Sequence, residues 1–264
     1  MITIYTDLCI LFGINVGAFC VILAFNIKEL NGISFFILML LYGFLTAPIF
    51  NYITMRRLNK INKNLYNDCN ITKYIEEYQK VYKKNTQKVF DITFRISLST
   101  GYINLGQFEK ALELLENGKP KFKNNKIDTY NKIAYYNNLA IIYLQLNNLE
   151  KAREMIDKMK ENINNSKLDK IKLEETELLY ETRKIELELA KEKTLNNLEN
   201  AKGLYLKLLE NANKNNKKVY YNYKLAEIYK EFGDKEKEEK CFSYIIENGG
   251  DTYYVQKVKE LMNK

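Results

Sequence analysis

Two stretches near the N-terminus contain no charged residue, and they limit the possible folds of this part of the chain more than any other feature. They cover residues 8–27 and 33–53. A helix of about 20 residues is about 30 Å long, which matches the hydrocarbon core of a bilayer. Because the joint between the stretches is short, the two helices would run antiparallel. The pattern predicts a transmembrane helical hairpin within residues 1–55, and the alternative is a buried helix pair of a soluble core.

The charges that flank the two stretches predict an orientation. Arg56, Arg57, Lys60 and Lys63 follow the second stretch, whereas the joint offers only Lys28. Positive residues are retained on the cytoplasmic side of a membrane. We therefore expect a two-span protein of the bacterial inner membrane, with the N-terminus and the long C-terminal part in the cytoplasm. The lipid bilayer is accordingly an expected partner.

Small residues in the first stretch indicate a helix contact. Gly13 and Gly17 lie one helical turn apart, and Asn15 lies between them. Glycines at this spacing let helices approach closely in lipid, and an Asn side chain can hydrogen-bond across the contact. We interpret these residues as packing contacts between the two spans. The alternative is a homo-oligomer formed through the first span.

The composition argues against most enzyme chemistry. His is absent, and the four Cys residues include no CxxC pair. Catalytic triads that need imidazole and the commonest zinc sites are therefore excluded. The sequence also lacks a Walker loop and a GxSxG motif, which are signatures of nucleotide binding and of Ser hydrolases. We expect no catalytic residue, no metal site and no cofactor, and we do not expect an enzyme.

The net charge of +8 does not by itself indicate nucleic acid as a partner. All but five of the 41 basic residues are Lys, and Asn is frequent as well. This usage is typical of a low-GC genome. Lys without interleaved Arg or aromatic residues favours a solvated helical surface over a nucleic-acid interface. The alternative, nucleic-acid binding, predicts an affinity that falls steeply with salt.

Beyond residue 56 the sequence predicts helices throughout. Apolar residues recur every three or four positions, without the alternation of strands. Residues 56–87 are predicted to form a basic juxtamembrane segment and a leading helix. Three later segments then share one frame. It reads Arg95-x2-Leu98-Ser99-x2-Tyr102 with Ala111-x3-Leu115, Tyr136-x2-Leu139-Ala140-x2-Tyr143 with Ala152-x3-Ile156, and Asn222-x2-Leu225-Ala226-x2-Tyr229 with Glu238-x3-Phe242.

This frame resembles the tetratricopeptide repeat (TPR) family, whose pattern is W-x2-L-G-x2-Y followed by A-x3-F. The resemblance implies an all-α protein in which residues 88–264 form an α-solenoid of stacked helical hairpins. Turn residues fall where each first helix should end, at Gly106, Asn147 and Gly233. The segment 168–213 must contain a further, divergent unit, in which only the second helix echoes the pattern. No unit has the family's Trp.

The resemblance further implies a concave groove lined by the first helix of each hairpin. The frame assigns it these candidate residues: Ile96, Thr100, Ile103, Asn104, Asn137, Asn138, Ile141, Gln145, Tyr223, Glu227 and Lys230. Some TPR proteins clamp a C-terminal carboxylate with Lys and Asn of the first two units. Here Ile96 and Thr100 occupy the first-unit positions, which argues against a receptor for chaperone tails. The alternative is that several of these residues pack against neighbouring helices.

These observations predict a membrane-tethered, non-catalytic scaffold or adaptor. Its TPR-like groove would bind a partner protein or peptide at the cytoplasmic face of the membrane. The alternative is a regulatory receptor of the TPR type, in which a peptide or partner changes the curvature of the solenoid.

Overall fold

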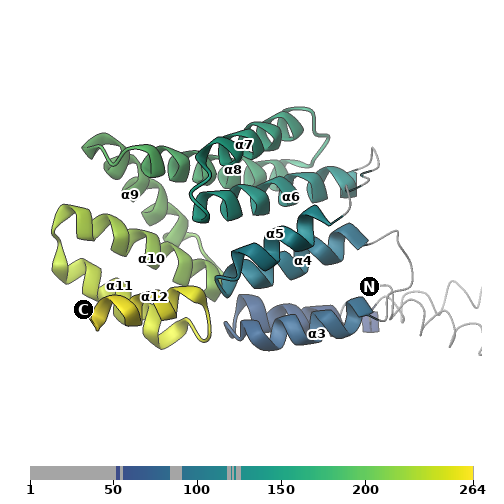
Figure 1. Cartoon of the computed structure of the whole chain (residues 1–264), viewed down its shortest axis with the longest axis horizontal. Coiled ribbons are helices and arrows are strands. Elements are labelled where there is room, and N and C mark those ends of the chain that lie inside the picture. Colours follow the sequence, from purple (N-terminus) through teal and green to yellow (C-terminus); the bar gives the residue numbers. More distant parts are fainter. Residues whose placement is uncertain are drawn as a thin grey trace, which may run out of the picture.

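The computed structural model describes residues 52–53, 56–83, 91–117, 120, 122 and 126–263, and these are helical almost throughout (Figure 1). Residues 56–66 form a helix ahead of the first labelled one. The labelled helices are α3 Ile71–Lys83, α4 Asp91–Asn104, α5 Phe108–Glu116, α6 Lys126–Gln145, α7 Leu149–Asn164, α8 Lys170–Lys191, α9 Leu195–Glu210, α10 Asn215–Phe232, α11 Lys235–Asn248 and α12 Tyr253–Met262.

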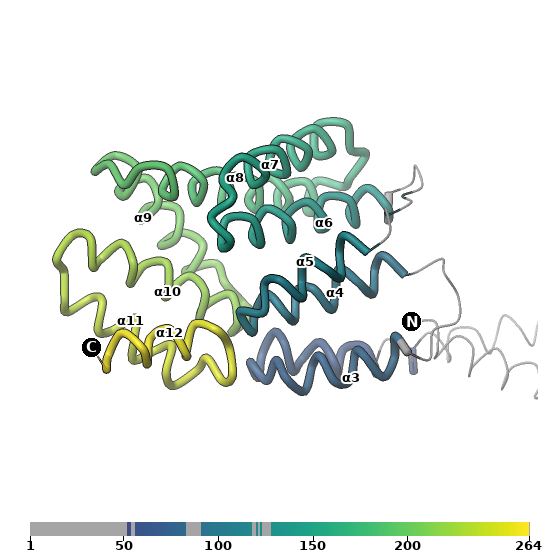
Figure 2. The backbone as a smooth tube through the Cα atoms, viewed as in Figure 1, coloured from purple at the N-terminus to yellow at the C-terminus, as the bar shows by residue number. Residues whose placement is uncertain are grey.

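The helices form consecutive antiparallel pairs that stack into a solenoid (Figure 2). The pairs are α4 with α5, α6 with α7, α8 with α9, and α10 with α11, while α12 packs against the last pair. Close backbone packing joins the first helices α4, α6 and α8 in sequence, whereas α8 and α10 lie farther apart. The divergent unit predicted at 168–213 is therefore the pair of α8 and α9.

The predicted turn residues end the first helices as expected. Gly106, Asn147 and Gly233 all have positive φ angles, of 74°, 56° and 72°. A left-handed residue at the end of a helix lets the last carbonyl groups find donors, and Gly and Asn adopt this conformation most easily. The next helix then begins with a side-chain cap in two of these turns. Asn148 and Asp234 each accept the backbone N–H three residues further on.

The small residues of the repeat frame lie at the helix contacts, as predicted. Ser99, Ala111, Ala140 and Ala152 are all fully buried. A small side chain lets two helix backbones approach closely, and the larger apolar residues of the frame fill the space on either side. In the divergent unit, Ala201 is also fully buried within the contact of α9 and α10.

The C-terminal end of the solenoid returns to its beginning. The Asp251 carboxylate accepts the backbone N–H of Ile71 at 2.6 Å and that of Thr72 at 2.9 Å. The N–H of Asp251 in turn donates to the Cys69 carbonyl at 3.1 Å. The first N–H groups of a helix have no partner within it. Asp251 therefore caps α3 from a distant part of the chain, and we call these three bonds the closure contact.

Aromatic packing extends the closure contact. The Tyr253 ring of α12 lies edge-on to the Phe108 ring of α5, with 5.4 Å between centroids. Asn215, at the start of α10, donates to the Asn248 carbonyl at 2.7 Å and accepts from the Tyr244 hydroxyl at 3.0 Å. Helix α12 thus joins the last helix pair, against which it packs, to α5 in the leading part of the solenoid (Figure 1).

The predicted membrane localisation requires a correction. Within the described ranges, no helix combines the length and the apolar character needed to cross a membrane. The longest of the labelled helices, α8, carries Lys and Glu along its length. This finding contradicts the two-span inner-membrane topology. The predicted spans and their packing residues Gly13, Asn15 and Gly17 lie outside the described residues, except for Tyr52 and Ile53.

Candidate functional site

Two adjoining cavities lie on the side of the solenoid formed by the first helices α4, α6, α8 and α10. The first cavity has a volume of about 130 Å³ and the second of about 180 Å³. Gln145 and Glu186 line both. The first is lined by Ile103, Asn104, Phe108, Ile141, Gln145, Arg183, Glu186, Asn216, Lys217, Tyr220, Tyr253 and Tyr254. The second is lined by Leu144, Gln145, Glu186, Leu189, Ala190, Lys193, Leu198, Tyr205, Lys224, Glu227, Ile228 and Glu231.

A buried ion pair forms one wall of the first cavity. Arg183 on α8 is only 5% exposed, and its guanidinium donates to the Glu186 carboxylate one turn further along. The other carboxylate oxygen of Glu186 accepts from the hydroxyls of Tyr220 and Tyr205, the latter at 3.2 Å. Burying a charge is costly unless it is paired and hydrogen-bonded. Here Glu186 has a partner for each oxygen, and Arg183 has a counter-charge.

The surroundings fix the protonation states of this group. Burial raises the pKa of Tyr205 and Tyr220, and the charge of Glu186 raises both further. Burial, the largest single effect, would lower the pKa of Arg183, but Glu186, Tyr220 and Tyr205 together outweigh it, so that the pKa is raised. The two hydroxyls therefore remain neutral donors and the guanidinium remains charged at physiological pH.

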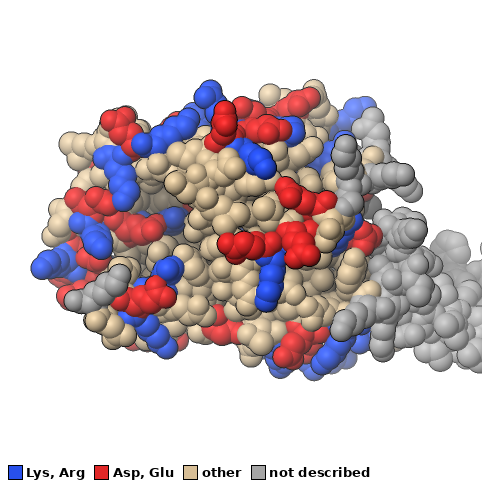
Figure 3. Space-filling view, in the orientation of Figure 1, with Lys and Arg blue, Asp and Glu red and all other residues tan. Residues whose placement is uncertain are grey.

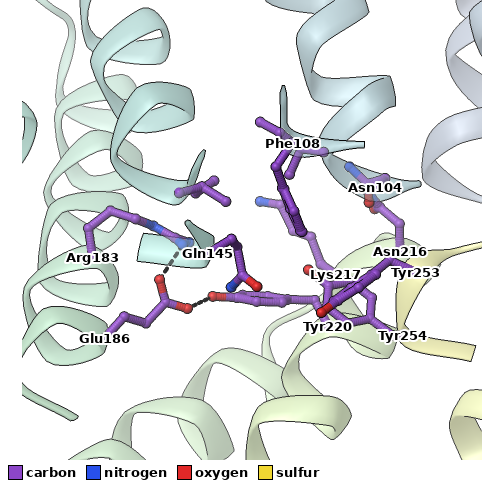
Figure 4. A pocket seen from close by; sticks show the side chains of 12 residues that line it. Asn104, Phe108, Gln145, Arg183, Glu186, Asn216, Lys217, Tyr220, Tyr253 and Tyr254 are labelled. Atoms are coloured by element: carbon purple, nitrogen blue, oxygen red, sulfur yellow. Dashed lines mark hydrogen bonds and ion pairs between the residues drawn. The ribbon is translucent and has the colours of Figure 1, made fainter. Parts of the chain in front are cut away.

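Figure 4 shows how the first cavity is arranged. Arg183 and Glu186 lie on one side and Asn104, Tyr253 and Tyr254 on the other, with the Tyr220 ring extending between them. The Tyr220 ring also packs against the Tyr254 ring, with 5.7 Å between centroids. The walls thus combine aromatic faces with amides and one ion pair, which suits non-covalent recognition of a ligand.

The second cavity is lined by further ion pairs. Lys224 on α10 contacts the Glu227 carboxylate at 2.9 Å, and Lys193 pairs with Glu231. Burial lowers the pKa of Lys224, but Glu227 and then Glu186 outweigh it, so that the pKa is raised well above its usual value. The acidic and basic side chains of the outer surface are likewise interspersed on the face shown in Figure 3.

The structure brings five of the predicted groove residues together at the cavities. Ile103, Asn104 and Ile141 line the first, Glu227 lines the second, and Gln145 lines both.

Other predicted groove residues serve as packing contacts. The Asn138 amide donates to the Thr100 hydroxyl at 2.9 Å and to the Ile96 carbonyl at 3.2 Å, which ties α6 to α4. Ile96 and Asn137 are themselves buried. Tyr223 packs against Tyr254, with 5.0 Å between ring centroids. Lys230 is exposed and lines neither cavity.

Sequence reasoning missed the central residues of the site. Arg183 and Glu186 lie on α8, where the repeat frame is too weak to assign a register. Tyr253 and Tyr254 lie on α12, beyond the last predicted unit. One signal was available, since Arg183 is one of five Arg in a chain that otherwise uses Lys. A planar guanidinium is better suited than an ammonium group to a buried ion pair.

Neither a metal-ligand cluster nor a reactive thiol is found among the described residues. In the part of the chain that the structure describes, no group of three His, Cys, Asp or Glu residues could hold a metal ion. Cys69 and Cys241 are free and buried, and burial raises the pKa of each thiol to about 11. Both thiols are therefore protonated at neutral pH and are weak nucleophiles.

Comparison with known proteins identifies the repeat. The family model of the SusR N-terminal TPR domain matches residues 72–244, from the start of α3 into α11. Searches of curated proteins and of solved structures give no match. The matched region contains the three predicted units, the divergent unit and most of the residues that line the two cavities. The chain belongs to the TPR family, as a member of the SusR N-terminal TPR domain type.

Proposed function

We propose that this chain is a non-catalytic scaffold that binds a segment of a partner protein at the two adjoining cavities. TPR domains are modules of protein–protein interaction. Residues of all four first helices line the first cavity, and residues of α6, α8 and α10 line the second. The observation that carries the proposal is that the two cavities share lining residues. Because Gln145 and Glu186 line both, one continuous segment can contact the two cavities at once.

The dimensions indicate what such a segment presents. Pockets for drug-sized ligands have volumes of about 300–1,000 Å³, whereas these cavities have about 130 and 180 Å³. Each cavity therefore has room for a side chain or a short stretch of backbone, and not for a whole helix. Three Tyr residues and one Arg are among the residues that line the first cavity, and both residue types are enriched among the anchors of protein interfaces.

Site-specific photocrosslinking in cells tests the proposal. A photoreactive residue at Gln145 of the full chain should form an adduct with a defined protein. The same residue at Lys230 is the matched control, since Lys230 is exposed on a first helix but lines neither cavity. The adduct should appear from position 145 only. Equal adducts from both positions, or none from position 145, would contradict binding at the cavities.

One observation favours a regulatory receptor as a second candidate. The first cavity is lined by Phe108 of α5 and by Tyr253 of α12, the two rings that meet beside the closure contact. A bound segment would therefore contact both ends of the solenoid. Spin labels at the exposed residues Lys110 and Lys259 report the separation of α5 and α12. A distance that changes when the crosslinked partner is added favours a receptor, whereas a constant distance favours a scaffold.

A further inference from the structure

We infer that the first cavity recognises a carboxylate group, held by Arg183, Lys217 and the N-terminus of α10. This inference deepens the proposed function, on which it rests, by naming the chemistry that the bound segment must present. The carboxylate can come from an acidic side chain or from the C-terminus of a chain, and the experiment below separates these two sources.

The start of α10 carries charges of the wrong sign for a helix N-terminus. The unpaired N–H groups there create a partial positive charge, which acidic residues and polar caps usually offset. The helices α7, α8, α9 and α11 begin with such a side-chain cap, whereas α5, α10 and α12 have none. Helix α10 instead has Lys214 at its N-cap without a side-chain hydrogen bond, and its first turn contains no acidic residue.

The positive charge at this end of α10 is not paired in a salt bridge among the described residues. Lys217 follows in the first turn and lines the first cavity. In the described ranges, neither Lys214 nor Lys217 forms a salt bridge. Lys214 lies over the Tyr66 ring, at 4.0 Å from its centroid. Burial and, to a smaller extent, the charge of Lys217 lower the pKa of Lys214, while the charge of Glu175 raises it.

Arg183 supplies an independent observation at the same cavity. Its side chain reaches from α8 into the cavity (Figure 4). Among the described residues its Nε is a buried donor without an acceptor. A buried donor left unpaired costs free energy, which an incoming acceptor would recover. Guanidinium groups bind carboxylates particularly well, because their donors form a planar fork.

The net charge of the residues that line the first cavity favours a carboxylate over a more highly charged group. Arg183 and Lys217 are the cations that line the first cavity, and Glu186 is its anion. Glu186 is already satisfied by Arg183, Tyr220 and Tyr205. The lining therefore has one surplus positive charge, which a single carboxylate balances and a phosphate dianion exceeds.

A second unpaired atom indicates what accompanies the carboxylate. In the described part of the chain, the side-chain oxygen of Asn216 is a buried acceptor without a donor. A peptide N–H next to the carboxylate would supply that donor. The rings of Tyr253 and Tyr254, with 5.7 Å between centroids, offer a wall for the apolar remainder of the segment. The residues that line the cavity therefore match a ligand that has a carboxylate, a neighbouring peptide N–H and a small apolar group.

Calorimetric titration of the full chain with three blocked dipeptides tests this inference. The probes are acetyl-Phe-Asp amide, acetyl-Phe-Asn amide and acetyl-Asn-Phe with a free carboxylate. At least one carboxylate probe should bind about tenfold more tightly than the neutral amide, as expected for one charge-assisted hydrogen bond. Preference for the Asp probe assigns an acidic side chain, and preference for the free acid assigns a chain terminus.

Two variants locate the effect. Lys217→Gln should weaken the affinity for the carboxylate probe about tenfold. Lys218→Gln also removes one positive charge, but Lys218 does not line the cavity, so this variant should leave the affinity unchanged. Both variants leave the buried pair of Arg183 intact. Failure of both carboxylate probes to bind, equal binding of the neutral probe, or equal effects of the two variants would overturn the inference. If photocrosslinking from Gln145 succeeds nevertheless, the proposed function stands and only the carboxylate is wrong.

Discussion

The helices α4 to α7 pack together differently from the pair α8 and α10. In the first region, small and apolar side chains of the repeat frame bring the helices together, and Ala140 and Ala152 are fully buried. In the second region, the helices lie farther apart, and Arg183, Glu186 and Tyr220 fill the space between them. The repeat signature is strong in the first region and weak in the second.

This difference indicates a division of labour along the solenoid. Positions that follow the family pattern are committed to helix packing, which leaves them little freedom to contact a ligand. Positions that depart from it place charged and aromatic groups at two cavities. Sequences that break a local packing rule commonly do so at functional sites. We therefore assign close backbone packing to the α4–α7 region and ligand binding to the α8–α10 region, where a buried ion pair replaces that packing, and the predictions below test this comparison.

The largest effect is expected from breaking the buried ion pair. Arg183→Met leaves the Glu186 carboxylate buried without its counter-charge, which should lower the free energy of unfolding by about 3–5 kcal/mol. Urea unfolding of the full chain measures this loss. Arg153→Met is the matched control, because Arg153 is exposed on α7. Similar losses in the two variants would show that the ion pair of Arg183 and Glu186 within α8 contributes no special stability.

A smaller loss should follow from enlarging a small residue in the first region. Ala152→Leu adds side-chain volume to a position that is fully buried, and overpacking of this kind costs about 1–3 kcal/mol. The melting temperature should fall accordingly. The same change at Ala190, which is exposed on α8, should leave the melting temperature nearly unchanged. An unaltered melting temperature for Ala152→Leu would contradict the assignment of this position to a tight helix contact.

The features that sequence reasoning predicted share a local origin. Gly106, Asn147 and Gly233 end helices because of their own backbone preferences, and the small residues recur at fixed spacings within one hairpin. These patterns can be read from a few neighbouring residues. The ion pair of α8 with its tyrosine partners depends instead on how two hairpins meet. Asp251 and Ile71 are still farther apart in the sequence, and no periodicity in either segment indicates that they touch.

A loss of about 0.5–2 kcal/mol, the usual cost of removing a helix cap, is expected for Asp251→Ala. Because this cap joins the two ends of the solenoid, amide hydrogen exchange should accelerate in α3 and in α12 together. Asp169→Ala is the matched control, since Asp169 caps α8 from the adjacent position, and exchange should accelerate in α8 alone. Unchanged protection of α3 in Asp251→Ala would show that the closure contact does not hold the ends together.

The smallest change in stability should accompany the clearest change in binding. Lys217→Glu replaces a cation by an anion in the first turn of α10, which should raise the free energy of unfolding by about 0.3–1 kcal/mol. The same substitution changes the lining of the first cavity from one surplus positive charge to one surplus negative charge, and it should abolish binding of the carboxylate dipeptides.

Lys218→Glu provides the comparison for this last prediction. It also places an anion near the start of α10, but it does not line the cavity, so stability should rise while binding is retained. If Lys217→Glu both raises the free energy of unfolding and abolishes binding, the natural Lys217 favours binding at the expense of stability. If Lys217→Glu lowered the free energy of unfolding instead, Lys217 would serve packing, as the small residues of the α4–α7 region do. The proposed difference between the two regions would then be wrong for the start of α10.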